Sequence, residues 1–262
     1  MKVVVCTKQT PSTTADLTVN PDGSVSWEDP GGKPNVVNPW DEYSIEEGIR
    51  LKENHGASDV IAITMGSEES QEALKTALAM GCTEAILLSD AAFAGVDTLG
   101  TAKVLAAAIN KVEDVQIAIF GKSAIDGDTG QTAVQTACQL GWTPLTFVSA
   151  ITAVGDGQIT VERLLDDGKE TVTAPLPVVI STVKEINEPR YPSFMGIRKA
   201  SRATIPVWAA GDLSLNSVGS KVDWSKVYAL PPREGSVEII EGDSVQEKAA
   251  KLVAKLFEEK VI

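Results

Sequence analysis

Apolar residues occur in two alternating patterns along most of the chain. Four short runs are rich in Val, Ile and Ala, which is typical of parallel strands buried on both faces. They span residues 2–7, 59–65, 84–88 and 115–120. Between them, helical periodicity is found over residues 38–55, 73–81 and 97–110. This alternation predicts an α/β protein with a doubly wound, mostly parallel sheet and right-handed crossovers.

Two segments instead alternate with the period of an antiparallel sheet. Leu17, Val19, Val25 and Trp27 flank the turn Asn20-Pro-Asp-Gly23, which predicts a β-hairpin inserted after the first strand. After residue 142, turns at 155–157 and 167–168 predict a β-meander at the edge of the main sheet. A buried strand over residues 175–183 and a Pro-broken loop over 184–200 are expected to follow.

The end of the chain has a different character. Residues 209–243 show little periodicity and end in Pro231-Pro232 and Gly235, so we expect an extended arm. The capping box Ser244-Val-Gln-Glu247 then predicts a final amphipathic helix. An arm and a helix of this kind need a surface to cover, on this chain or on a partner.

Residues 120–132 are the strongest candidate for a ligand site. They follow an apolar strand, are rich in Gly, Ser, Thr and Asp, and lead into a small-residue helix that Gly141 ends. This order places backbone N–H groups and hydroxyls at the carboxyl edge of a parallel sheet, where phosphates bind. An ordinary strand-to-helix turn explains the same residues equally well.

Several known motifs are absent. Gly121-Lys-Ser123 lacks the earlier Gly of a Walker P-loop, because position 116 is Gln, and no Gly-x-Gly-x-x-Gly follows a strand. The only histidine, His55, stands before Gly56 at a helix end, where we expect a capping role. Asp126 and Asp128 suit acid–base or Mg²⁺ chemistry, but turn hydrogen bonds explain them more simply. Without a catalytic set, chemistry is expected from a bound cofactor.

Composition narrows the class of protein further. The 262 residues, 43% hydrophobic, suffice for one large domain or a domain with an added lobe. A net charge of −13 does not favour nucleic acid or anionic lipid. Cys6, Cys82 and Cys138 lie far apart in apolar or small-residue surroundings, so we expect buried free thiols. With neither a signal peptide nor a membrane-spanning run, the expected location is the cytoplasm.

The chain resembles the beta subunit of electron-transfer flavoproteins. Matching strings occur in the family's order over nearly the whole chain. They are Val5-Cys-Thr-Lys8, Asn38-Pro39 before an acidic helix, Ala77-Leu-Ala-Met-Gly81, Gly121-Lys-x-Ala-Ile-Asp126, and Asn187-Glu-Pro-Arg-Tyr191 followed by Lys199-Ala200. The resemblance implies an adenine-nucleotide α-hydrolase-like fold and a heterodimer with an FAD-carrying alpha subunit. It implies a nucleotide-binding domain over 1–208, and a C-terminal arm and helix over 209–262 that embrace the alpha subunit.

The resemblance is compatible with either of two nucleotides bound in this chain. Beta subunits hold either AMP as a structural ligand or, in electron-bifurcating members, a second FAD that accepts a hydride from NADH. The loop Asp126-Gly-Asp-Thr-Gly-Gln131 is similar to that of bifurcating members, as are Lys8-Gln9-x-Pro11 and Thr64-Met65-Gly66. Gly127 leaves space that an acidic side chain would fill and removes a charge near a pyrophosphate. Gly130 and Ala133 depart from the family pattern.

We therefore expect FAD in this chain, with electrons passing from NADH through the alpha-subunit FAD to a dehydrogenase- or quinone-type acceptor. The alternative is structural AMP, with electrons moving between acyl-CoA-type dehydrogenases and the alpha-subunit FAD. A stand-alone nucleotide-sensing protein is a third possibility, from another class.

The resemblance also implies the residues of each site, with no catalytic residue and no metal ligand. Partner docking falls on Arg190, Tyr191, Phe194, Met195 and Ile197, within a partner-recognition loop over 184–200. Leu164 stands where some members carry an acidic docking residue. The expected nucleotide contacts are Cys6, Lys8, Asn38, Pro39, Trp40, Asp41, Met65, Lys122, Ser123, Ala124, Ile125, Asp126, Gly127, Asp128, Thr129, Gly130, Gln131 and Thr132.

Overall fold

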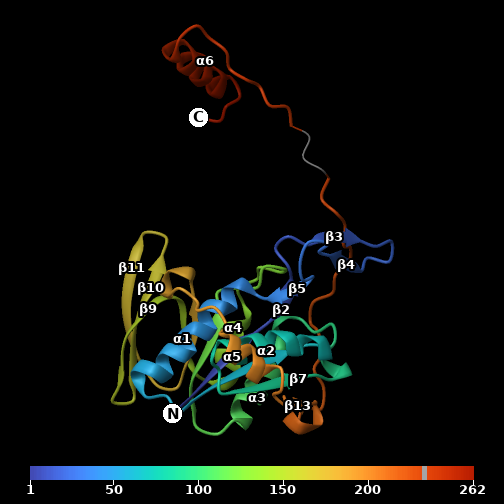
Figure 1. The fold of residues 1–262 in the computed structure, drawn as a ribbon, viewed down its shortest axis with the longest axis vertical. Helices are drawn as coiled ribbons and strands as arrows, with labels where there is room; N and C mark the ends of the chain where they lie inside the picture. Colours follow the sequence, from blue (N-terminus) through green and yellow to red (C-terminus); the bar gives the residue numbers. More distant parts are fainter. Residues whose placement is uncertain (232–234) are drawn as a thin grey trace. The chain divides into compact units, whose positions relative to one another are not determined.

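The computed structural model describes residues 1–231 and 235–262, which form two compact units, Met1–Val227 and Tyr228–Ile262. Pro232 of the expected arm lies outside the described residues. In the first unit, nine of the described strands form one sheet in the order β11-β10-β9-β12-β8-β1-β6-β7-β13. Figure 1 shows β9, β10 and β11 at one side of this sheet and β7 and β13 at the other. The strands are β1 (Lys2–Thr7), β6 (Asp59–Met65), β7 (Glu84–Leu88), β8 (Val115–Gly121), β9 (Thr143–Gly155), β10 (Gln158–Leu165), β11 (Gly168–Pro175), β12 (Val178–Thr182) and β13 (Val207–Trp208).

Most of this sheet is parallel, which confirms the predicted fold class. In the stretch of the sheet that runs β9-β12-β8-β1-β6-β7-β13, every neighbouring pair is parallel. By contrast, β10 runs antiparallel to both β9 and β11. The meander β9–β11 thus extends one edge, as its turns predicted. The two-residue strand β13 on the other edge is too short to leave a periodic pattern in the sequence.

Helices cover the sheet in two layers. On one face α1 (Pro39–His55) and α2 (Gln71–Met80) share a core with Val3, Val5 and Leu87. On the other face α3 (Thr98–Lys111) and α4 (Thr132–Leu140) share a core with Val4 and Ile63. Helix α1 packs so closely on the sheet at Gly48 that a Cβ there would collide with Val5 and Val60.

The order of the strands fixes where a ligand edge lies. From β1 the chain passes to β6 and β7 on one side, then crosses to β8 and β12 on the other. Doubly wound sheets bind ligands outside the carboxyl ends of their strands, where this direction reverses. Here that position lies between the ends of β1 and β8, at Lys8 and Lys122.

Smaller elements confirm some expectations and correct others. The inserted hairpin is present as β3 (Asp16–Val19) and β4 (Val25–Glu28). A second antiparallel pair, β2 (Gln9–Pro11) and β5 (Asn35–Val37), was not predicted, because its three-residue strands are too short to show alternation.

Two further expectations were wrong. The Pro-broken segment before residue 200 contains a helix, α5 (Phe194–Ala200), whose cap Ser193 accepts a hydrogen bond from the Gly196 N–H. Its seven residues are too few to establish a helical period. Cys138 is exposed on α4, although Cys6 and Cys82 are buried as expected.

Part of the predicted arm packs on the first unit. Leu213 and Val218 are buried in the core that α3 and α4 share. These apolar residues are irregularly spaced, so no sequence period marked them as core.

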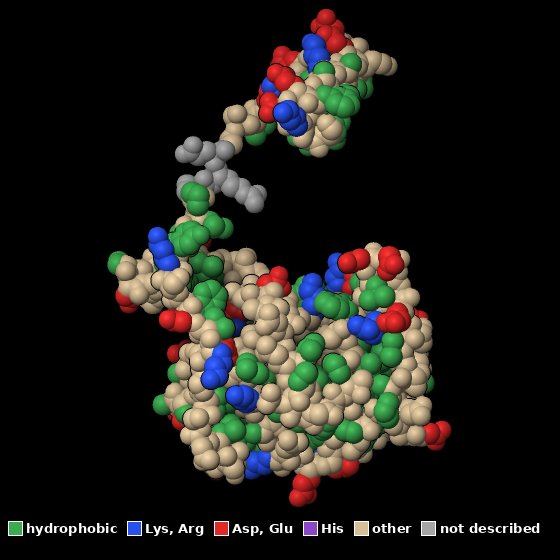
Figure 2. Space-filling view, turned by 180° about the vertical axis from the view of Figure 1, so that it is seen from behind, with side chains coloured by type: hydrophobic (Ala, Val, Ile, Leu, Met, Phe, Trp, Pro, Cys, Tyr) green, Lys and Arg blue, Asp and Glu red, His purple; other side chains and the backbone are tan. Residues whose placement is uncertain are grey.

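The second unit contains the predicted last helix, α6 (Val245–Glu258). The Ser244 hydroxyl accepts a bond from the Glu247 N–H, and the Glu247 carboxylate accepts one from the Asp243 N–H. Leu252, Val253 and Phe257 are exposed. Figure 2 shows apolar side chains along one side of this unit. Among the described residues, no helix is long and apolar enough to cross a membrane.

Candidate functional site

One buried carboxylate joins the strand ends at the switch point. The Asp41 side chain, from the first turn of α1, accepts hydrogen bonds from the N–H groups of Lys8 (2.8 Å) and Gly121 (3.2 Å). Asp41 is only 5% exposed. A Cβ at Gly121 would collide with the Asp41 carboxylate and with Trp40, so only glycine fits there. The first turn of α1 is therefore locked between the ends of β1 and β8.

Burial determines the titration of this carboxylate. It raises the pKa of Asp41 from 3.8 to about 7, although hydrogen bonds from Asn38, Lys8 and Gly121 act in the opposite direction. Burial, and secondly the nearby Asp41 charge, also raises the pKa of the Cys6 thiol. Cys6 packs in the core, so its thiol is not an accessible group at this edge.

Asn38 fixes the loop that follows β8. Its amide nitrogen donates to the Ser123 carbonyl (2.8 Å), and its amide oxygen accepts from the Ile125 N–H (3.1 Å). Asn38 does occupy the N-cap position of α1, but its side chain makes no capping bond there. Asn is a preferred N-cap residue, but here the amide instead holds the backbone of a loop more than eighty residues away.

The loop itself is exposed and carries opposite charges. The Lys8 ammonium group bonds both carboxylate oxygens of Asp126, at 2.8 and 2.7 Å. The Ser123 hydroxyl donates to Asp128 (2.6 Å), and the Lys122 ammonium lies 4.7 Å from the centre of the Trp40 ring. Asp128 thus bonds within the loop as expected, whereas Asp126 pairs with Lys8, 118 residues away in the sequence. No group of acidic, His or Cys residues in the described ranges is arranged to hold a metal ion.

The start of α4 offers donors for an anion. Gln131, at the N-cap position, makes no side-chain capping bond, so the first-turn N–H groups lack the usual side-chain acceptor. The neighbouring Gln135 has a buried amide oxygen without a protein partner. With the positive end of the α4 dipole and the Lys8 and Lys122 ammonium groups close to the same loop, these residues fit a nucleotide phosphate.

Most of the expected nucleotide contacts gather at this edge. They come from the end of β1, the start of α1, the end of β6 and the loop between β8 and α4. Pro39, Trp40 and Met65 are half-buried there, and Ala124 accepts bonds from the N–H groups of Gly127 and Asp128 within the loop. Thr129 and Gly130 are exposed, and Thr132 begins α4.

The expected docking residues form a separate, exposed group. The side chains of Tyr191, Phe194, Met195 and Ile197 are 95, 80, 70 and 53% exposed. Arg190 differs from them, because its guanidinium bonds Glu46 and Glu53 on α1. No sequence motif marked Glu46 as a functional residue. Its position beside the apolar residues Ile45 and Ile49 was the available signal of a buried, paired acid.

The strand order and the residues between β1 and β8 define a class of protein. It is a doubly wound α/β protein with a loop suited to bind phosphate at the point where the strand order reverses. Residues 30–213 match the model of the electron transfer flavoprotein domain family. The chain is 37% identical to "Caffeyl-CoA reductase-Etf complex subunit CarD" of Acetobacterium woodii, with full coverage of both chains. It is 39% identical to electron transfer flavoprotein subunit beta of Clostridium acetobutylicum, again with full coverage of both chains. It is 36% identical to the same subunit of Mus musculus, over 98% of this chain and 97% of the relative.

This chain belongs to the electron transfer flavoprotein beta subunit family. The resemblance drawn from its short sequence strings is thereby confirmed.

Proposed function

We propose that this chain binds FAD at the edge between β1 and β8, as the beta subunit of a bifurcating electron transfer flavoprotein heterodimer. Electrons from NADH leave through the alpha-subunit FAD to a dehydrogenase- or quinone-type acceptor. The observation that carries the choice of FAD is the space at Gly127. Nothing lies within 4 Å of a Cβ placed there, and the surrounding loop is exposed.

The residues at this edge have distinct tasks in the proposal. Lys8, Lys122 and the first-turn N–H groups of α4 bind phosphate oxygens, and Asn38 keeps the loop in place for them. Asp126 neutralises Lys8 until a phosphate competes for it. Bound FAD supplies hydride acceptance and one-electron transfer, which none of these side chains provides.

The alpha subunit is the proposed partner of the C-terminal segment over residues 209–262. Support comes from α6, which carries no buried residue and exposes Leu252, Val253 and Phe257 on its own unit. Apolar side chains left exposed in this way are suited to cover a partner. The exposed residues between 191 and 197, together called the docking segment below, are proposed to meet the redox partner.

A specific observation favours the AMP alternative. The edge offers one helix N-terminus and two lysines, and one of these, Lys8, is already paired with Asp126. Such a small donor set suits the single phosphate of AMP. In that case the chain would hold a structural nucleotide, and the redox chemistry would lie in the alpha subunit.

Nucleotide analysis of the purified heterodimer separates these readings. After denaturation, chromatography is expected to yield two FAD per heterodimer, whereas one FAD and one AMP would assign the alternative. A chain that purifies without an alpha subunit and binds ATP would instead support a stand-alone nucleotide sensor.

The Gly127→Asp variant tests the role of the open space directly. We expect it to lose most of one FAD per heterodimer, because the added carboxylate fills the space and repels a pyrophosphate. Gly155→Asp is the matched control: a Cβ at Gly155 also meets nothing within 4 Å, and the residue ends β9. Equal FAD content in both variants would contradict the assignment.

A further inference from the structure

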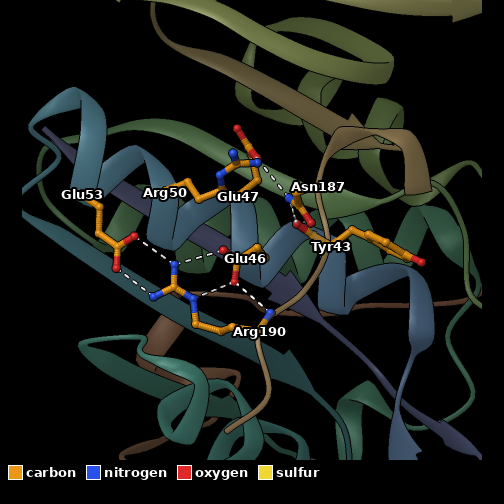
Figure 3. Close-up of polar contacts among 7 residues, drawn as sticks. All are labelled: Tyr43, Glu46, Glu47, Arg50, Glu53, Asn187 and Arg190. Carbon is orange, nitrogen blue, oxygen red and sulfur yellow. Dashed lines mark hydrogen bonds and ion pairs between the residues drawn. The ribbon is translucent and has the colours of Figure 1, made fainter. Parts of the chain in front are cut away.

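A charged cluster fixes the chain to α1 immediately before the docking segment. The Glu46 carboxylate accepts bonds from three Arg190 groups, the backbone N–H (3.2 Å), Nε (2.8 Å) and Nη2 (3.0 Å) (Figure 3). The Glu53 carboxylate accepts from Nη1 (2.7 Å) and Nη2 (2.9 Å) of the same guanidinium. Two carboxylates, two turns apart on one helix, thus hold one arginine in fork geometry.

This arrangement leaves Arg190 little to offer to another molecule. Both terminal nitrogens and Nε already donate to carboxylates within the chain. Glu46 is 5% exposed, so removing Arg190 would leave a buried carboxylate without its principal partner. A lysine carries the charge but cannot reproduce the fork, because its ammonium is a single point of donation.

The preceding residues are held on the same helix. The Asn187 amide nitrogen donates to the Tyr43 carbonyl and to the Glu47 carboxylate, both at 3.0 Å (Figure 3). Arg50 also lies within 3.7 Å of Glu47. Residues 187 and 190 are therefore both tied to α1 by side-chain bonds.

The other end of the docking segment is fixed by close packing. Gly196 of α5 lies against the Ala79 carbonyl of α2, and a Cβ at this position would collide with that backbone atom. The docking segment is therefore held near both ends: Arg190, just before it, bonds α1, and Gly196, near its end, packs against α2. Its apolar side chains nevertheless point to solvent, at 53 to 95% exposed.

We propose that Arg190 is a positioning residue, which holds the docking segment in its binding conformation from within the chain instead of contacting the redox partner. The proposal rests on the proposed function only in taking residues 191–197 as the docking surface. A segment ordered in advance loses less conformational entropy on binding. The pairs of Arg190 with Glu46 and Glu53, called the clamp below, thereby support docking although Arg190 makes no partner contact.

Hydrogen exchange of the nucleotide-loaded heterodimer, with no redox partner present, tests this assignment. In Arg190→Ala, amides over residues 187–197 are expected to exchange about tenfold faster or more, since local opening no longer breaks the two carboxylate pairs. Amides of β1 and β8 are expected to keep their wild-type rates. Arg190→Lys is expected to lie between wild type and Arg190→Ala. Arg202→Ala is the matched control, because in the described residues its side chain makes no hydrogen bond or ion pair.

Glu53→Gln separates a clamp from a direct partner contact. If Arg190 acts through α1, this change on the helix accelerates exchange in the docking segment in the same way. Unchanged exchange in both Arg190→Ala and Glu53→Gln would overturn the proposal, as would faster exchange spread over the whole sheet. Should Arg190→Ala fail to assemble, Arg190→Lys and Glu53→Gln decide the question. Released nucleotide, measured on the same samples, reports on the proposed function independently.

Discussion

Replacing Asp41 by Asn is expected to remove a large pH dependence of stability. Burial raises the Asp41 pKa from 3.8 to about 7, so the folded protein binds this proton more tightly than the unfolded chain does. A group of this kind stabilises the folded state below pH 4, and that contribution is lost as pH rises to about 7. The variant has no proton to lose at this position.

The magnitude follows from the size of the shift. About three pKa units at ~1.36 kcal/mol each correspond to about 4 kcal/mol in total. Between pH 5 and 8 only the part up to pH 7 contributes, so the free energy of unfolding of wild type should fall by about 3 kcal/mol relative to Asp41→Asn. The variant also loses one acceptor for the Lys8 or Gly121 N–H, which lowers its stability at every pH by about 1–3 kcal/mol.

Urea unfolding of the loaded heterodimer at several pH values provides the measurement. Asp90 is a matched control, because its carboxylate also accepts two backbone N–H bonds, from Ala92 and Ala210, but is only half-buried. These bonds lower the pKa of Asp90, so Asp90→Asn should change the pH dependence in the opposite direction. Parallel pH curves for wild type and Asp41→Asn would refute the reasoning, since they would mean that the hydrogen bonds outweigh burial.

Two further substitutions test the supports of the site. Asn38→Ala removes the bonds to Ser123 and Ile125, and we expect nucleotide affinity to fall by about 1–3 kcal/mol, measured by equilibrium dialysis; unchanged affinity would show that the loop holds itself. Gly48→Ala places a methyl group against Val5, and urea unfolding should report a loss of about 1–3 kcal/mol; a neutral effect would mean that α1 can shift outward.

The sequence predicted best what depends on local pattern. Buried parallel strands have a distinctive composition, and the hairpin and meander turns contain residues suited to tight turns. These signals located β1, β6, β8 and the loop after β8 within a residue or two. The edge of the sheet followed from topology alone, because the direction of winding determines where strand ends meet.

Interactions between distant residues were not predictable in the same way. Asn38 has the right residue type for a cap and stands at the right position, yet its amide bonds residues 85 and 87 positions away. Asp41 likewise satisfies the dipole rule, but its bonds to Lys8 and Gly121 determine its burial and its pKa. Local rules accounted for the positions of these residues on the helix, whereas the bonding partners of their side chains depend on the packed fold.

The acidic residues of α1 show how such long-range roles can be recognised in a sequence. The helix dipole favours acids in the first turn, which accounts for Asp41 but not for Glu46 and Glu47 in the following turns. Since a buried unpaired carboxylate is costly, acids adjoining the apolar positions Ile45 and Ile49 indicate partners elsewhere in the chain. Those partners belong to the Asn187-Glu-Pro-Arg-Tyr191 string. One helix therefore supports the proposed nucleotide site with its first turn and the proposed docking segment with the turns that follow.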